Sequence, residues 1–134
     1  MRFEVRLTAD ALRDLEEIDD WISMHDSPAK AEHVVASIEA AIAALGRFPE
    51  RGRHPAELLA LGIREYRETF FKPYRIVYFV AGKRVYVTLV ADGRRDMQAL
   101  LGRRLVRDWL RGLDIRTVFT YSRAPWGRSR LSKN

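Results

Sequence analysis

The segment from residue 63 to residue 92 restricts the possible folds most, because it holds three consecutive runs with strand character. The runs read IREYRETFF, YRIVYFV and RVYVTLVA, and they are rich in the β-branched and aromatic side chains that fit a pleated surface. Ala81-Gly82-Lys83 is short enough for a hairpin turn, and Lys72-Pro73 separates the first two runs. The segment is therefore predicted to form a three-stranded meander.

The residues before this segment predict one further strand and two helices. Residues 2–7 alternate between polar and apolar side chains, which is the period of a half-buried strand. Thr8 is suited to cap a following helix, whose apolar residues recur at spacings of four, three and four: Ala11, Leu15, Ile18 and Ile22. Ser27-Pro28 is typical of the start of a second helix, which should reach Leu45. Two such helices joined by a short turn are expected to form an antiparallel hairpin that covers a sheet.

The rest of the chain is predicted to be a loop, a closing helix and a tail. Residues 48–62 contain two prolines and two glycines, and are expected to be a loop with at most one helical turn. After Gly93, apolar residues at helical spacing predict a C-terminal helix: Met97, Leu100, Leu101 and Leu105. The predicted fold is α+β, a small antiparallel sheet of an N-terminal strand plus a three-stranded meander, packed against a two-helix hairpin, with a C-terminal helix. Residues 1–106 form the domain, and residues 107–134 a basic, partly disordered extension.

Charge is divided unevenly along the chain. Residues 1–46 carry ten acidic and four basic side chains, whereas residues 47–106 carry six acidic and thirteen basic ones. The last 28 residues carry two acidic and seven basic side chains, and the whole chain has a formal net charge of +6. Charge alone favours solvated charged faces as the explanation, and a surface that approaches a polyanionic nucleic acid is the alternative.

Composition excludes several kinds of site. There is no cysteine, so a disulfide framework and a thiolate metal site are impossible. His25, His33 and His54 have no metal-ligand spacing, and we expect neither a metal nor a cofactor. The first ten residues alternate in polarity instead of forming a basic and then apolar leader, and no run is long enough to span a bilayer. The sequence therefore predicts a soluble, cytoplasmic protein.

Three pieces of the sequence resemble the RelE/ParE toxin superfamily of type II toxin–antitoxin systems. They are the PERGR turn, the KPYRIVY strand and the final strand that runs into DGRRDM, in that order on the expected elements. The resemblance covers residues 3 to about 106 and leaves the basic tail outside. It implies a toxin that arrests growth and is held inactive by a cognate antitoxin in a hetero-oligomeric complex.

The superfamily divides by target, and this chain is closer to the ParE-like members. RelE-like toxins cut messenger RNA on the ribosome, which needs a base, a group that stabilises the phosphate and a proton donor. Arg75 and Arg95 match family arginines, but EYRE stands where paired lysines are expected and Leu101 where an aromatic residue is expected. An arginine that stays protonated binds phosphate well and is a poor base. The residues therefore favour binding, as in ParE-like toxins that block DNA gyrase, over metal-independent RNA cleavage, in which Arg75 and Arg95 would be catalytic.

Other interpretations of these residues remain open. A tyrosine or the loop histidine could replace the missing proton donor: Tyr66, Tyr74, Tyr78, Tyr86 or His54. Arg75 and Arg95 could instead pair with nearby carboxylates and serve the structure alone. The predicted target-binding set is Arg64, Arg67, Tyr74, Arg75, Arg94 and Arg95. A third possibility is a domain that keeps its antitoxin contact and has lost toxicity.

The first helix and the tail carry aromatic residues of uncertain role. Trp21 is expected in the core, the more common place for tryptophan, or at the surface as an anchor for the antitoxin. With Ile22 it forms the predicted antitoxin contact, to a segment that lays apolar side chains over the helical hairpin and acids near the arginines. Four aromatic residues lie among the basic side chains of the tail: Trp109, Phe119, Tyr121 and Trp126. They suit a nucleic-acid-binding extension, although an unselected extension is the simpler interpretation.

Overall fold

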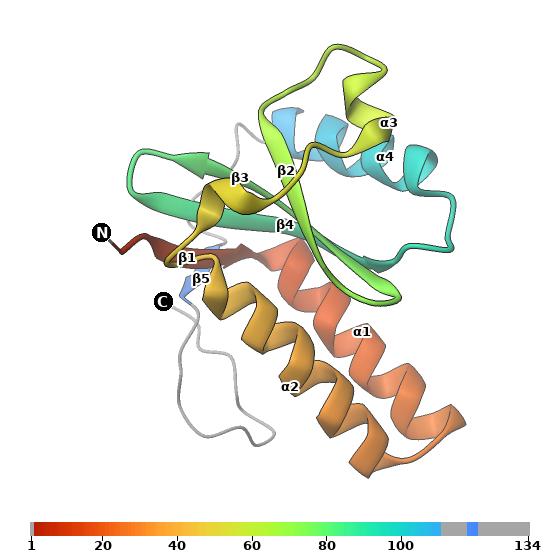
Figure 1. The fold of residues 1–134 in the computed structure, drawn as a ribbon. Coiled ribbons are helices and arrows are strands. Elements are labelled where there is room, and N and C mark those ends of the chain that lie inside the picture. The colour runs from red at the N-terminus through yellow and green to blue at the C-terminus, as the bar shows by residue number, and fades with distance from the viewer. Residues whose placement is uncertain (1, 111–117, 121–134) are drawn as a thin grey trace.

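A five-stranded sheet forms the centre of the protein. The structure is a computed structural model that describes residues 2–110 and 118–120. The strands are β1 (Glu4–Thr8), β2 (Tyr66–Phe71), β3 (Tyr74–Ala81), β4 (Arg84–Asp92) and β5 (Val118–Thr120), and their order in the sheet is β2-β3-β4-β1-β5. β2, β3 and β4 form the predicted antiparallel meander, with Gly82 at a positive φ of 62° in the β3–β4 turn. Figure 1 shows this sheet between two groups of helices.

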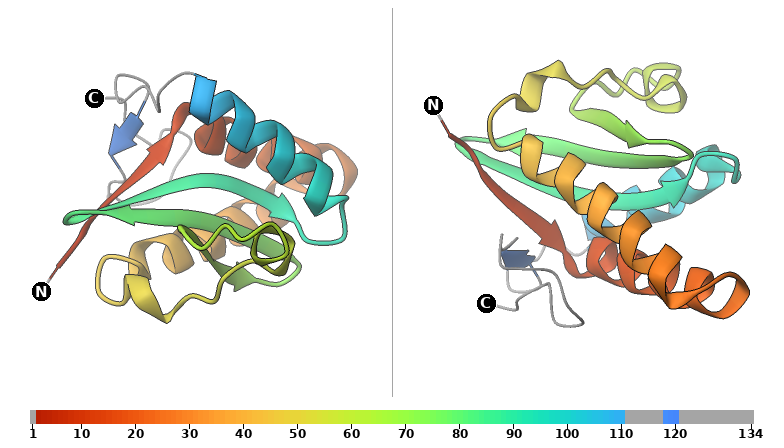
Figure 2. Two further views of the ribbon diagram at one scale, coloured as in Figure 1. Left: turned by 90° about the horizontal axis from the view of Figure 1, so that it is seen from above. Right: turned by 60° about the horizontal axis from the view of Figure 1, so that its bottom comes forward.

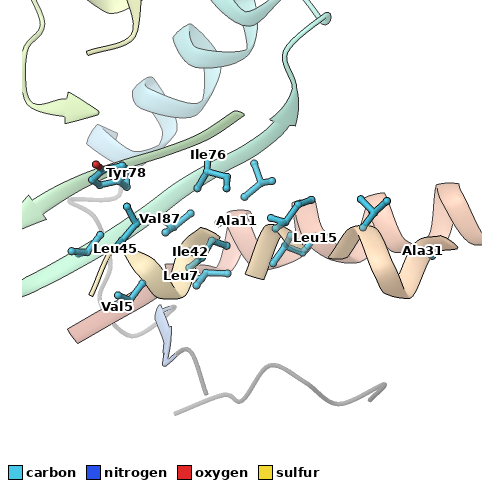
Figure 3. Close-up of a cluster of buried hydrophobic side chains, with 14 of the residues drawn as sticks. Val5, Leu7, Ala11, Leu15, Ala31, Ile42, Leu45, Ile76, Tyr78 and Val87 are labelled. Atoms are coloured by element: carbon cyan, nitrogen blue, oxygen red, sulfur yellow. The ribbon is translucent and has the colours of Figure 1, made fainter. Parts of the chain in front are cut away.

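The helical hairpin covers one face of the sheet, as predicted. α1 (Ala9–His25) and α2 (Pro28–Ala44) begin at the expected caps, since Thr8 Oγ1 accepts from the Ala11 backbone N–H and Ser27 Oγ from that of Lys30. Their apolar sides join strands β1, β3 and β4 in the larger hydrophobic cluster, and Figure 3 shows these side chains pointing toward one another. Its labelled members include Leu7, Leu15, Ile42, Ile76, Tyr78 and Val87.

Two further helices cover the opposite face. α3 (Ala56–Leu59) is the predicted single turn in the long loop, and α4 (Met97–Leu110) is the predicted closing helix. The right-hand view of Figure 2 places α2 in front of the sheet and α4 behind it. The second hydrophobic cluster lies here and consists of Leu58, Val77, Leu89, Ala91, Met97 and Leu101. β4 is therefore buried on both faces from Val85 to Ala91, which accounts for its almost continuous apolar sequence.

The sheet is mixed rather than wholly antiparallel. β1 runs parallel to β4, with Val5 opposite Val85 and Leu7 opposite Val87. β5 then pairs with β1 in the antiparallel sense, Leu7 opposite Phe119. α4 also continues to Leu110, four residues past the predicted domain end. Through β5, part of the presumed extension joins the sheet. The prediction that the final part of the extension is disordered concerns residues outside the described ranges.

The PERGR turn packs tightly over the centre of β2 and β3. Pro49–Arg51 forms the short 3-10 helix η1, and the carbonyl of Pro49 accepts the hydroxyl proton of buried Tyr78. A Cβ atom on Gly52 would lie 2.2 Å from Tyr78 Oη and 2.7 Å from the Glu68 carbonyl oxygen. Glycine is therefore required here by close approach, and not by a left-handed backbone.

Beyond the end of β1, side chains from α1 and α4 bind the free edge of β4. The β3–β4 register skips Thr88, because Val77 pairs with Leu89 and Tyr78 with Val87. The Thr88 carbonyl accepts from Arg104 Nη1 at 2.6 Å, and the Val90 N–H donates to Asp14 Oδ2 at 3.0 Å. Arg104 and Asp14 also pair with each other at 3.0 Å through both guanidinium nitrogens. This pair fixes both helices to the sheet next to the groove described below.

Candidate functional site: a groove between α1 and the end of β4

A cavity of about 490 Å³ lies between the outer half of α1 and the segment where β4 leaves the sheet. Its lining residues are Asp14, Glu17, Ile18, Trp21, Ile22, Tyr74, Val90, Ala91, Asp92, Arg94 and Arg95. The groove therefore combines apolar, aromatic, acidic and basic groups. It also brings together residues that the sequence assigned to two separate contacts: Trp21 and Ile22 to the antitoxin, and Tyr74, Arg94 and Arg95 to the target.

The basic side of the groove is built by the turn after β4. Asp92 closes β4 opposite Tyr74, and the Gly93 N–H bonds the Pro73 carbonyl at 2.8 Å. Asp92 Oδ1 accepts from the backbone N–H and from Nε of Arg94, both at 2.9 Å, so the turn holds the Arg94 side chain in place. This arginine lowers the pKa of the Asp92 carboxyl. Arg95 is exposed, and it forms no ion pair with the described part of the chain.

The aromatic side of the groove is Trp21 on α1 and Tyr74 on β3. Trp21 is 61% exposed, so its expected place in the core is wrong: the apolar stripe of α1 passes through Ile22, which is 7% exposed, and leaves its neighbour outside. The indole stacks on the His25 ring at a centroid distance of 4.2 Å, and His25 Nδ1 lies 2.8 Å from the Trp21 carbonyl oxygen. Burial, with a smaller effect of the Asp92 charge, raises the pKa of the Tyr74 hydroxyl.

The acidic side of the groove was not foreseen as part of a site. Asp14 projects from α1 toward β4, and burial raises the pKa of its carboxyl despite the opposing effect of Arg104. Asp10 and Asp14 are one helical turn apart on α1, which was the only sequence signal for a shared face, and nothing in the sequence paired that face with Arg104 on α4.

Arg75, predicted as a catalytic or target-binding residue, is held inside an ion-pair cluster on the α3 side of the sheet. Its Nη1 and Nη2 donate to the two carboxylate oxygens of Glu57 at 2.8 and 2.7 Å, and its Nε donates to Glu68 at 2.7 Å. The side chain is 12% exposed, and a Cβ on Gly93 would lie 2.8 Å from its Cδ. The pairing lowers the pKa of Glu57 to about 2 and raises the pKa of Arg75. All directions suited to a bidentate phosphate contact are therefore occupied, and the purely structural role is the one that the geometry supports.

The two arginines predicted on β2 and before it lie away from the groove. Arg67 donates from Nη1 to the carbonyls of Gly52 and Glu50 at 2.8 and 3.2 Å, and so ties the PERGR turn to β2. Arg64 is exposed in the loop before β2. Neither of them lines the cavity with Arg94 and Arg95.

The candidate replacements for a proton donor are mostly engaged elsewhere. Tyr78 is fully buried, and Tyr86 is 6% exposed and stacked on Phe79. His54 Nδ1 lies 3.0 Å from the Tyr66 carbonyl oxygen at the outer edge of β2. Leu101, where an aromatic residue was expected, is 1% exposed in the second hydrophobic cluster. Of the five candidates, Tyr74 is the one that lines the groove with Arg94 and Arg95.

Two classes of site are absent from the described residues. In residues 2–110 and 118–120, no three histidine, aspartate or glutamate side chains come close enough together to hold a metal ion. Within the same ranges, no helix has the length and apolar character needed to cross a bilayer. The groove itself combines the aromatic residues Trp21 and Tyr74 with acidic and basic side chains.

Comparison with known proteins gives a family and a fold. The model of a family described as the ParE toxin of the type II toxin–antitoxin system parDE matches residues 5–97. No curated protein sequence matches the chain. Three solved structures share between 12% and 23% sequence identity with it.

The chromosomal ParDE system from P. aeruginosa is 21% identical, with a TM-score of 0.59 over 68% of this chain and 96% of that one. A mutant of the E. coli toxin RelE in the free state is 12% identical, with a TM-score of 0.54 over 80% of this chain and 98% of that one. The RelBE toxin–antitoxin complex from Mycobacterium tuberculosis is 23% identical, with a TM-score of 0.49 over 69% of this chain and 99% of that one. The first two likenesses confirm the fold. The family match covers more than two thirds of the chain, from β1 to the start of α4, and confirms the RelE/ParE superfamily and its ParE branch. The chain belongs to the ParE toxin family of type II toxin–antitoxin systems.

Proposed function

We propose that the chain is a toxin that arrests growth by binding a macromolecular target, DNA gyrase, rather than by cutting RNA. The observation that carries the proposal is the confinement of Arg75 between Glu57 and Glu68, because the resemblance matches Arg75 to an arginine of RelE-like nucleases. A guanidinium whose three donor nitrogens already contact carboxylates cannot contact a scissile phosphate without breaking this cluster.

The groove between α1 and the end of β4 is the proposed contact surface. An apolar and aromatic side formed by Trp21 and Ile22 faces the arginines of the turn after β4. This arrangement suits a peptide segment with apolar side chains flanked by carboxylates. The apolar side chains would pack against Trp21 and Ile22 while the carboxylates pair with the arginines. Since the predicted antitoxin residues line one groove with Tyr74, Arg94 and Arg95 of the predicted target set, we propose that the antitoxin neutralises the toxin by occupying the surface that the target needs.

The second candidate function is a ribosome-dependent RNA nuclease with an altered site. The observation in its favour is that Arg94, Arg95 and Tyr74 line the same groove. Two cations could stabilise a phosphate there and the tyrosine could donate a proton. Tyr74 cannot be the base of this mechanism, because its raised pKa keeps its hydroxyl protonated at neutral pH. Both candidate targets, gyrase and the ribosome, place the protein in the cytoplasm.

Induction of the chain without its antitoxin separates the two functions. We expect growth arrest with a DNA damage response and intact messenger RNA. Arg95→Ala is expected to relieve the arrest, and Arg103→Ala, at an exposed position of α4 away from the groove, serves as the matched control. Cuts in translated messages without DNA damage would contradict gyrase as the target and indicate the ribosome. Unimpaired growth with a folded protein would show that toxicity has been lost.

A further inference from the structure

A second concavity lies at the corner between the end of α2 and β2, away from the groove described above. Its volume is about 310 Å³, and its lining residues are Ala41, Ala44, Leu45, Phe48, Arg51, Gly52, Arg53, Glu68, Thr69 and Phe70. It shares no lining residue with the α1–β4 groove. We call Phe48, Arg51, Arg53 and Phe70, together with the neighbouring Arg47, the arginine–phenylalanine corner.

Two guanidinium groups of this corner are stacked on phenyl rings. Arg51 Cζ lies 4.0 Å from the centroid of the Phe48 ring, and Arg53 Cζ lies 4.7 Å from that of Phe70. Such stacking uses the flat face of the guanidinium and leaves its N–H edge available, except that Arg53 Nε donates to Glu68 Oε2 at 3.1 Å. Phe48 is 50% exposed and the Arg53 side chain 70% exposed, so rings and cations are accessible together.

The corner has an excess of positive charge over an apolar floor. Residues 47–53 carry three arginines against one glutamate, Glu50. The Glu68 carboxylate beneath the corner is already paired with Arg53 at 3.1 Å and with Arg75 at 2.7 Å. The floor formed by Ala41, Ala44 and Leu45 offers side chains without hydrogen-bonding groups. A ligand for this site should therefore carry negative charge outside and a flat apolar surface inside.

We propose that the arginine–phenylalanine corner binds single-stranded nucleic acid, with phosphates on Arg47, Arg51 and Arg53 and a base in the concavity beside Phe48. Stacked aromatic rings next to a cationic path are the general device for such binding, and it is tolerant of sequence because every base has a flat face. A concavity of about 310 Å³ has room for a base. An acidic peptide that bound as a helix would place apolar side chains over two turns and would need a groove longer than this concavity. Nucleic acid is therefore favoured over an acidic peptide.

This binding site is independent of the proposed gyrase contact, because it lies at another corner of the fold. It would allow the toxin to hold a protein partner in the α1–β4 groove and a nucleic acid strand at the same time. Binding through the corner involves no cleavage, so the strand is expected to remain intact.

The test is the affinity of the antitoxin-free full chain for a fluorescein-labelled 12-nucleotide oligothymidylate, measured by fluorescence anisotropy at two salt concentrations. Arg51→Glu and Phe48→Ala change exposed side chains of the corner. Arg103→Glu makes the same charge change as Arg51→Glu on α4, which covers the opposite face of the sheet. All variants keep residues 107–134, so any contribution of the basic extension is the same in each.

We expect Arg51→Glu and Phe48→Ala each to weaken binding about tenfold or more, in line with the loss of a phosphate contact and of base stacking. Arg103→Glu should change the affinity less than about threefold. Of the two corner variants, Arg51→Glu but not Phe48→Ala should reduce the salt dependence of binding. Equal weakening by Arg51→Glu and Arg103→Glu would overturn the proposal, because the binding would then follow net charge alone. An unchanged affinity of Phe48→Ala, or displacement of the oligonucleotide by polyglutamate of equal length at lower concentration, would overturn it as well. Thermal unfolding of each variant checks that the fold is retained.

Discussion

Replacing Glu57 by glutamine preserves the size of the side chain and removes the charge that holds Arg75. The pKa of Glu57 is lowered from 4.5 to about 2, chiefly by its hydrogen bonds to Arg75. At about 1.4 kcal/mol per pKa unit, this shift corresponds to an upper limit of about 3 kcal/mol of stability. Because 25% of the Glu57 side chain is exposed, solvent screening reduces the contribution, and we expect Glu57→Gln to lower the free energy of unfolding by about 1–2 kcal/mol at pH 7.

The pH dependence of this difference gives the sharper test. The pKa of Glu57 is lower in the folded protein than in the unfolded chain, so its contribution is complete above about pH 5 and is lost as the pH falls from 4.5 toward 2. Urea unfolding of wild type and Glu57→Gln at pH 7, 5.5 and 3 should therefore give a stability difference that shrinks at pH 3. Glu32→Gln, at an exposed position of α2, is the control and should differ little from wild type at every pH. Equal stability of Glu57→Gln and wild type at pH 7 would refute the structural role of the Arg75 cluster.

Three further predictions test the packing and the groove. Gly52→Ala should destabilise the protein by about 3 kcal/mol or prevent folding, because its Cβ would lie 2.2 Å from a tyrosine hydroxyl. Gly102→Ala, in open space on α4, should stabilise the protein by about 0.5–1 kcal/mol, and thermal unfolding compares the two variants. Arg104→Met should cost about 3–5 kcal/mol, because the largely desolvated Asp14 carboxylate loses its guanidinium partner and keeps only the Val90 N–H. Addition of Asp14→Leu should recover part of this loss in urea titrations. Trp21→Ala, at a position 61% exposed, should change stability by less than about 0.5 kcal/mol and weaken antitoxin binding about 30-fold or more in calorimetric titrations; an unchanged affinity would remove this residue from the interface.

Local patterns in the sequence were sufficient for most of the secondary structure. The caps Thr8 and Ser27, the meander with its turn at Gly82, and the closing helix all depend on residues close together in the chain, and all are confirmed. The pairing of β1 with β4 joins segments about 80 residues apart. Nothing local specifies its direction, which is why the sheet was expected to be antiparallel throughout.

The candidate site was harder to predict because its geometry is long-range. The resemblance matched Arg75 to a family arginine, but its partner Glu57 lies 18 residues away on α3, and only the folded chain brings the two together. The position of Trp21 was predicted wrongly for a local reason. Its neighbour Ile22 continues the apolar stripe of α1, and a shift of one residue on a helix turns the side chain about 100° away from it. The shared groove for the predicted antitoxin and target residues could be recognised only from the packing of α1 beside the end of β4.

The central claim is that the toxin acts by binding through the α1–β4 groove and not by cleavage, and a gyrase supercoiling assay with the purified chain tests it most directly. We expect the wild-type chain to inhibit supercoiling, Arg95→Glu to lose the inhibition while Arg103→Glu keeps it, and antitoxin to restore supercoiling at equal molar ratio. Unaffected gyrase, together with cleavage of messenger RNA by the same preparation in a translation reaction, would contradict the claim.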